Sequence, residues 1–191
     1  MTAGRRSNEP APAPTLSPQA LARFDAQVLP HLDAAYNLAR HLLRDAHDAE
    51  DMVQESFLKA VRFFDGFRGG DGRTWLLAIV RNTCFTQLRR RRSAGEKIEF
   101  DEELHSEVDV AADPASELER VAAAATLDEA MSRLPVEFRE VLVLRELEEL
   151  SYKEIAAIAQ CPENTVKTRM FHAKKKLEPL LARLLSAGGL Q

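Results

Sequence analysis

The segment from Leu150 to Leu177, LSYKEIAAIAQCPENTVKTRMFHAKKKL, most constrains what this chain can fold into. Ser151 stands three residues before Glu154, which is the spacing of a capping box at the start of a helix. The pattern predicts a first helix from about Ser151. It predicts a second from about Pro162, because proline suits the first turn of a helix. Two short helices joined by a tight turn form a helix-turn-helix.

The second of these helices combines an apolar side with a basic, hydrogen-bonding side. Val166, Met170 and Leu177 can face the interior. The other faces carry side chains suited to DNA phosphates and base edges, namely Lys167, Thr168, Arg169, His172, Lys174 and Lys175. A solvated basic helix end, favoured by the helix dipole, explains the run 174–176 equally well by itself. The capped first helix and the turn favour DNA binding.

Charge is unevenly distributed along the 191 residues. The net charge of −4 excludes a non-specific nucleic-acid coat, since such proteins are strongly basic. Residues 68–92 contain seven arginines and one acidic residue, whereas residues 96–120 hold ten acidic residues and two basic ones. This segregation favours separate DNA-facing and protein-facing surfaces.

The cysteines and the hydropathy pattern indicate a cytoplasmic protein. Cys84 and Cys161 provide neither a disulfide framework nor a zinc-binding spacing, which fits a reducing compartment. No apolar run approaches the roughly 18 residues of a membrane span, and the first residues lack the apolar core of a signal peptide. We expect neither export nor membrane insertion.

Composition divides the chain into four segments. Residues 1–18 are rich in proline and small residues, so we expect a disordered tail. Helical domains are predicted over residues 19–93 and 119–185, joined by an acidic linker at 94–118 that we expect to be flexible. Roughly 25 extended residues reach about 80 Å. That length spans two sites separated by two turns of DNA, each about 34–36 Å long.

Helical periodicity dominates both domains. Residues 48–64 place apolar side chains at three- and four-residue spacing, and similar patterns occur at 32–43 and 75–88. Alternating β-branched residues bounded by turns do not occur, so the sequence predicts an all-α fold of two small helical domains.

The segment FRGGDGRTW connects two of the predicted helices. Its glycine spacing matches neither the P-loop nor the dinucleotide fingerprint, so we interpret it as an ordinary connection. Arg68, Arg73 and Arg81 surround Trp75, and a basic cluster at 89–92 closes the following helix. Basic groups interleaved with an aromatic ring are typical of single-strand binding surfaces. Burial of Trp75 in the core is an equally good interpretation.

Acidic residues gather at the start of the helix at 48–64. Asp51 and Glu55 share one face, on which we expect no supporting lysine, so the two carboxylates repel each other. A basic protein partner would explain them. We expect no metal site, because His41, His47 and the nearby carboxylates lack a recognised ligand spacing.

Two long segments carry a resemblance to a known family. AEDMVQESFLKAVRFFDGFRGGDGRTWLLAIVRNTCFTQLRRRR resembles region 2 of the extracytoplasmic-function (ECF) sigma factors of the sigma-70 family. LDEAMSRLPVEFREVLVLRELEELSYKEIAAIAQCPENTVKTRMFHAKKKL is similar to their region 4. The likeness covers roughly 160 residues. Both segments in this order, separated by a short linker, are more specific than either alone.

The resemblance implies a transcription initiation factor that binds core RNA polymerase, directs it to promoter DNA and is held by an anti-sigma factor. It implies neither enzymatic activity nor a cofactor. Polymerase docking falls on Asp48, Asp51, Gln54, Glu55 and Phe57. Contacts with the −10 element fall on Arg68, Arg73, Trp75, Asn82 and Arg89. Contacts with the −35 element fall on Thr165, Lys167, Thr168, Arg169, Phe171, His172 and Lys175. His172 departs from the family, which often has arginine there.

Two other classes of protein remain open at this point. A stand-alone helix-turn-helix regulator would use its N-terminal helices to dimerise or to sense a ligand. A protein-interaction module would carry basic faces that have no role in DNA binding. A ligand-sensing regulator has no need of the FRGG loop followed by an arginine-rich helix, and co-purification with core polymerase would separate these alternatives.

Overall fold

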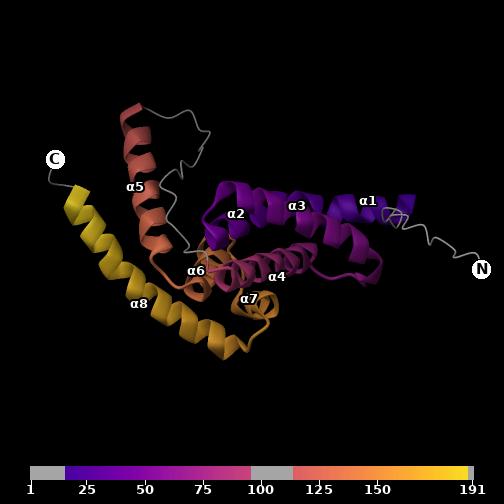
Figure 1. Ribbon diagram of the computed structural model, residues 1–191. Coiled ribbons are helices and arrows are strands. Elements are labelled where there is room, and N and C mark those ends of the chain that lie inside the picture. Colours follow the sequence, from indigo (N-terminus) through magenta and orange to yellow (C-terminus); the bar gives the residue numbers. More distant parts are fainter. Residues whose placement is uncertain (1–15, 96–113, 189–191) are drawn as a thin grey trace, which may run out of the picture.

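The computed structural model describes residues 16–95 and 114–188, and within these ranges every regular element is a helix (Figure 1). The predicted all-α class is therefore confirmed. Residues 1–15 of the predicted tail and residues 96–113 of the predicted linker lie outside the described residues. The helices form two groups, which we call the N-terminal bundle and the C-terminal bundle.

The N-terminal bundle spans residues 18–93 and has a core between α2, α3 and α4. Its elements are α1 (Pro18–Gln27), η1 (Leu29–His31), α2 (Leu32–Leu43), α3 (Ala46–Phe63), η2 (Phe64–Gly66) and α4 (Gly72–Ser93). The predicted amphipathic helices at 32–43, 48–64 and 75–88 correspond to α2, α3 and α4. Leu38, Leu42 and Leu77 are completely buried, and each contributes about 1.5–3 kcal/mol by leaving water.

The loop between η2 and α4 is held close to α1. Gly69 and Gly70 have φ of 94° and 112°, in the left-handed region that favours glycine. A Cβ atom on Gly72 would lie 2.0 Å from the backbone oxygen of Gln27, so only glycine permits this approach. Asp71 then begins α4, since its side chain accepts from the backbone N–H groups of residues 73 and 74.

The C-terminal bundle consists of α5 (Pro114–Ser132), α6 (Val136–Leu142), the π-helical turn η3 (Val143–Leu147), α7 (Tyr152–Ala159) and α8 (Glu163–Gly188). Helix α5 begins at Pro114, inside the range 94–118 that we assigned to the linker. Proline is well tolerated at the first position of a helix. In Figure 1, α5 and α8 extend away from the rest of the molecule, and α6 and α7 lie beside α4.

The two bundles pack directly against each other. Helix α4 lies on α7, and α2 lies on α6 (Figure 1). Arg139 of α6, only 6% exposed, donates to the carbonyl of Leu42 in α2 at 3.3 Å. The same guanidinium donates to the carbonyls of Ser132 and Leu134 at the end of α5. Burial, partly offset by Glu137, lowers the pKa of Arg139 to about 10, so the group stays cationic at neutral pH.

Candidate functional site

The helix-turn-helix forms as its sequence predicts. Ser151 caps α7, and its hydroxyl and the Glu154 carboxylate form both bonds of the capping box. These hydrogen bonds lower the pKa of Glu154. Ile155, Ile158 and Val166 are completely buried. Helix α8 is thereby fixed against α7 and α6.

Most of the predicted −35 residues lie on the open side of α8. Lys167, Thr168, Phe171, His172 and Lys175 are exposed, whereas Thr165 is half-buried. Local contacts orient several of them. The Lys167 ammonium lies 2.9 Å from the Glu163 carboxylate, the Thr168 hydroxyl donates to the backbone oxygen of Asn164, and the His172 ring stacks on Phe138. This face projects cations and hydrogen-bonding groups outward, as a helix in the major groove requires.

Arg169 is turned away from this face. Its guanidinium nitrogen lies 3.7 Å from the carboxylate of Glu140, and its side chain is 25% exposed. The structure therefore does not group Arg169 with the exposed residues of α8. Sequence periodicity missed this, because a guanidinium in an amphipathic helix is taken by default to face water.

The predicted −10 residues occupy α4 and the loop before it. Arg68 is exposed, and Trp75 is half-buried with its ring centroid 4.9 Å from Phe67 and 6.0 Å from Phe64. Trp75 thus belongs to an aromatic cluster and also lines a cleft of about 950 Å³ between the loop and α7. Lys153 of α7 lies on the other wall. Both interpretations of Trp75 are compatible with this position.

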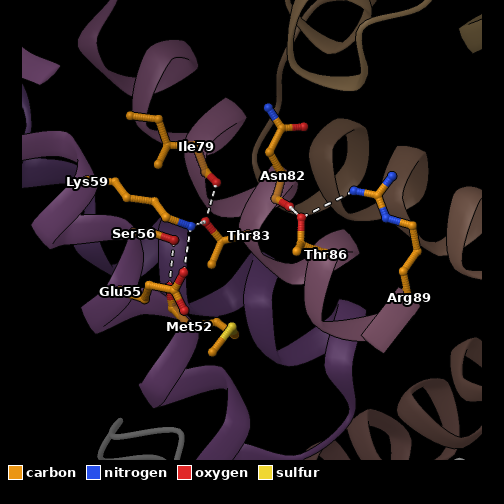
Figure 2. A network of polar contacts seen from close by, with 9 residues as sticks. All are labelled: Met52, Glu55, Ser56, Lys59, Ile79, Asn82, Thr83, Thr86 and Arg89. Carbon is orange, nitrogen blue, oxygen red and sulfur yellow. Dashed lines mark hydrogen bonds and ion pairs between the residues drawn. The ribbon is translucent and has the colours of Figure 1, made fainter. Parts of the chain in front are cut away.

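Asn82 and Arg89 lie farther along α4 (Figure 2). The side-chain oxygen of Asn82 accepts a hydrogen bond from the guanidinium of Arg81 at 3.3 Å. Arg89 is exposed, and its guanidinium donates to the hydroxyl of Thr86 at 3.2 Å. Arg89 therefore keeps most of its guanidinium edge available to a phosphate.

Arg73, by contrast, is bound to the C-terminal bundle. Its guanidinium forms an ion pair with the carboxylate of Glu148, which is 5% exposed. Arg81 of the same helix pairs with Glu140 at 2.7 Å. Burial raises the pKa of Glu140, although the bond from Arg81 opposes this effect. Sequence analysis did not single out Glu140 or Glu148.

The predicted polymerase-docking residues are divided between open and anchored positions. Asp51 and Gln54 are exposed on α3. Glu55 is half-buried and lies 2.7 Å from the ammonium of Lys59, four residues farther on. The expectation of a face without a supporting lysine was therefore wrong. The pair removes the repulsion from which we inferred a basic partner, so that inference is weaker at Glu55 than at Asp51.

Figure 2 shows how this part of α3 is fastened to α4. Lys59 donates to the hydroxyl of Thr83 at 3.1 Å, and Thr83 donates to the backbone oxygen of Ile79. Ser56 is completely buried and donates to the backbone oxygen of Met52. Of these bonds, only the one from Lys59 to Thr83 joins α3 to α4, and Asp51 and Gln54 are exposed on α3.

Asp48 and Phe57 are anchored more deeply. The Asp48 carboxylate pairs with Arg91 of α4, and the Phe57 ring packs edge-on against Phe24 at 5.3 Å. Two apolar side chains that the periodicity did not indicate, Leu58 and Phe63, are 66% and 59% exposed on the same helix. Exposed large apolar groups that lie together are typical of a protein-binding face.

Metal binding and membrane spanning are two further possibilities for the described residues. Among the residues that the structure describes, no group of three or more histidine, cysteine or acidic side chains is placed to hold a metal ion. No helix within those residues is long and apolar enough to cross a membrane.

The protein-family model of Sigma-70 region 2 matches residues 28–94 of this chain. The family model of Sigma-70, region 4 matches residues 124–177. The chain is 36% identical over 170 residues to the RNA polymerase sigma-H factor of Pseudomonas aeruginosa, covering 85% of this chain and 88% of that protein. It is 37% identical over 147 residues to the ECF RNA polymerase sigma-E factor of Escherichia coli K12, covering 71% of this chain and 77% of that protein.

Solved structures give the same result. The sigma factor RpoE of Bartonella quintana, in complex with the anti-sigma factor NepR, matches with a TM-score of 0.70 and 27% identity over 84% of this chain and 97% of that one. CnrH in complex with the cytosolic domain of CnrY matches with a TM-score of 0.56 and 27% identity, over 87% of this chain and 90% of that one. The chain belongs to the sigma-70 family and, within it, to the ECF sigma factors.

Proposed function

We propose that this chain binds core RNA polymerase and directs it to promoter DNA as an initiation factor. One observation carries the proposal, which is that regions 2 and 4 stand in one chain with a capped helix-turn-helix in the second. A stand-alone regulator would need the helix-turn-helix alone and leaves the matched region 2 unexplained. The chain acts without enzymatic chemistry of its own, in the cytoplasm.

Polymerase docks on α3 in this proposal. Asp51 and Gln54 offer exposed polar groups, and Leu58 and Phe63 add apolar area beside them. Charges at such an interface steer association, while buried apolar groups supply most of the affinity. Asp48, Glu55 and Phe57 stabilise the position of this face, through contacts with Arg91, Lys59 and Phe24 respectively.

The two DNA elements are contacted by different bundles. Lys167, Thr168, Phe171, His172 and Lys175 approach the −35 element with α8, joined by Thr165 and Arg169. Arg68, Arg73, Trp75, Asn82 and Arg89 hold the opened strand of the −10 element. Extruding a base costs a few kcal/mol, so a basic surface with an aromatic platform is needed to retain it.

An anti-sigma factor is the further partner that we propose. The two matching structures were solved as complexes of a sigma factor with NepR or with the cytosolic domain of CnrY. Their likeness to this chain covers both bundles. A protein inhibitor released by a stress or another signal would fit a chain of this architecture.

Purification with core polymerase tests the proposal. The chain is expected to form a stable complex with core enzyme, and only the complex should bind a cognate promoter tightly at physiological salt. The free chain has a net charge of −4, which disfavours binding to DNA without polymerase. Nanomolar, sequence-specific binding by the free chain, together with no complex with core enzyme, would instead establish the stand-alone regulator.

Duplex and pre-opened templates test the assignment of the −10 surface. Arg68→Ala with Asn82→Ala should impair transcription from duplex DNA, and a template carrying a bubble at the −10 element should restore most of it. Lys167→Ala should reduce upstream protection in footprinting on both templates. If Arg68→Ala with Asn82→Ala removed upstream protection as completely as Lys167→Ala, the two surfaces would not have separate roles.

A further inference from the structure

A cavity of about 520 Å³ lies in the C-terminal bundle, where α8 passes the end of α5 and the start of α6 (Figure 1). Its floor is apolar and consists of Leu134, Pro135, Pro179 and Leu180. Sites for small organic ligands have volumes of about 300–1,000 Å³ and are mostly apolar, with a few polar groups that orient the ligand. The cavity therefore has the size and the floor of a small-molecule site.

The floor offers no hydrogen-bond donor of its own. Proline has no backbone N–H, and the N–H of Leu134 is already bonded to the oxygen of Met131 at 3.0 Å. The N–H of Leu180 lies inside the helix α8, where it is bonded to the preceding turn. Polar recognition of a ligand must therefore come from the rim of the cavity.

Every charged side chain on the rim is a cation. Arg133 stands at the end of α5, and Lys175, Lys176 and Arg183 stand on α8. No carboxylate is found among the described residues that line the cavity. Like charges gathered around one cavity repel each other, and a bound anion would relieve this repulsion. The rim is therefore complementary to a negatively charged ligand.

Three of these cations are uncompensated within the protein. Lys175, Lys176 and Arg183 are exposed and form no ion pair in the part of the chain that the structure describes. By contrast, the neighbouring Lys174, which does not line the cavity, pairs with Glu146 at 2.8 Å. The unpaired cations of this part of α8 are thus the ones that border the cavity.

Most of the rim lies away from the side of α8 that carries Lys167. Lys176 is nine residues beyond Lys167, which at 3.6 residues per turn places it about 180° around the helix. Arg183 is sixteen residues beyond Lys167, or about 24 Å along the axis, about twice the width of the major groove. The rim meets the face proposed for the −35 element at His172 and Lys175.

The charge of the rim suits a phosphate better than a carboxylate. A phosphate monoester carries about 1.5 to 2 negative charges at pH 7, and guanidinium groups bind its oxygens in pairs. We propose that the cavity binds a small, soluble organic phosphate. Its phosphate would lie among Arg133, Lys176 and Arg183, and its apolar part would lie on Leu134 and Leu180. The site itself does not depend on the proposed function.

The position of Lys175 gives the ligand a regulatory effect. Lys175 lines the cavity and also belongs to the residues proposed to contact the −35 element. The ligand and the promoter therefore compete for this cation. This part of the inference rests on the proposed function, because it takes the open side of α8 to be a DNA surface.

Calorimetry of the full chain with 1-naphthyl phosphate tests the site. This probe joins a phosphate monoester to an apolar ring system, and one molecule should bind per chain. Inorganic phosphate and uncharged 1-naphthol each lack one half of the probe, and 1-naphthoate carries a single charge. Each should bind at least about tenfold more weakly, the factor expected when one charged hydrogen bond is lost. Equal affinity for inorganic phosphate or for 1-naphthoate would overturn the proposed ligand class.

Two double variants locate the site. Lys176→Ala with Arg183→Ala should weaken binding of 1-naphthyl phosphate at least about tenfold and retain helical content, since both side chains are exposed. Lys174→Ala with Arg62→Ala removes two exposed cations that do not line the cavity, and should bind the probe as wild type does. Wild-type affinity in the first variant, or an equal loss in the second, would overturn the assignment to this cavity.

Transcription by core polymerase on genomic DNA tests the competition. At ten times its dissociation constant, 1-naphthyl phosphate should lower transcripts that depend on this chain by up to about elevenfold when promoter binding is unsaturated. Lys176→Ala with Arg183→Ala should initiate as wild type does and resist the probe. Wild-type transcription unchanged by the probe would overturn the competition. No chain-dependent transcripts even without the probe would contradict the proposed function, whereas calorimetry judges the cavity independently.

Discussion

The carboxylate of Glu148 is bound to the guanidinium of Arg73, which ties the approach to the helix-turn-helix to the first turn of α4. Arg73 lies in the part of the sequence that resembles the −10 reader, and Glu148 lies in region 4. A cation of one bundle that we propose to contact DNA is therefore paired with a carboxylate of the other bundle. The predictions below separate contacts that serve binding from contacts that hold the protein together.

Reversal of two acidic residues tests the docking face. Asp51→Lys with Glu55→Lys should abolish binding to core polymerase, because an exposed carboxylate that steers association becomes a repelling cation. Pull-down with core enzyme measures this. Since Glu55 pairs with Lys59, we expect a loss of about 0.5 kcal/mol of helix stability and retained helical content.

A second double variant controls for total charge. Asp25 and Asp65 are exposed on α1 and η2. Asp25→Lys with Asp65→Lys changes the net charge by the same amount and should bind core polymerase as wild type does. An equal loss of polymerase binding in both double variants would assign the effect to overall charge. Full binding by Asp51→Lys with Glu55→Lys would exclude α3 as the docking face.

Lys167 tests the DNA face of α8. Lys167→Ala should lower the affinity of the polymerase complex for a duplex promoter and reduce the slope of log K against log salt by about 0.9, the value for one phosphate contact. Arg183→Ala, an exposed cation farther along the same helix, should leave the slope unchanged. Identical slopes for wild type and Lys167→Ala would exclude Lys167 from the phosphate contacts.

The capping box was predictable from two residues spaced three apart in the sequence, whereas the contact between bundles was not. Ser151 and Glu154 act on each other over one helical turn, so their spacing determines the outcome. Arg139, Glu140 and Glu148 are buried, and each contacts a residue of the other bundle. Charged residues are rarely buried without partners, and two of those partners, Arg81 for Glu140 and Leu42 for Arg139, lie 59 and 97 residues away in sequence.

Other differences have equally local causes. Lys59 was overlooked because it was not placed on the Glu55 face, although a four-residue spacing brings the two together. The start of α5 at Pro114 falls in an acidic stretch whose composition resembles a linker. Periodicity placed the basic side chains of α8 on its outer faces, and it cannot distinguish the inward-turned Arg169 from the exposed Lys167.

Removal of the cap tests how much it contributes to stability. Ser151→Ala should lower the free energy of unfolding by about 1 kcal/mol, because the backbone N–H of Glu154 loses the hydroxyl to which it donates. Chemical denaturation measures the loss. Thr126→Ala, which removes an exposed hydroxyl from α5, should lower the free energy of unfolding by less. An equal loss of stability in both variants would show that the cap contributes nothing special.

His41 should make stability depend on pH. Burial lowers the pKa of His41 below 6.5, with Arg40 and Arg139 acting in the same direction and Asp128 and Glu148 opposing them. Asp128 is 4.0 Å away, too far for a hydrogen bond. Because the unfolded chain binds a proton more readily, stability should fall as pH decreases from 6.5 through the lowered folded value.

Thermal unfolding of wild type and His41→Gln at pH 7.5 and pH 5.5 measures this contribution. Wild type should lose more stability between the two values than the variant does, because glutamine carries no titrating group. His47, which is exposed on α3, provides the control His47→Gln, and this variant should keep the wild-type pH dependence. An unaltered pH dependence in His41→Gln would exclude His41 as its source.

Initiation by purified components tests the central claim most directly. Core RNA polymerase would transcribe sheared genomic DNA of the source organism with and without this chain, and the 5′ ends of the transcripts would be sequenced. We predict a defined set of start sites that appear only with both components, each preceded by two shared sequence elements about two helical turns apart. Start sites unchanged by the chain would contradict its role as a promoter-directing sigma factor.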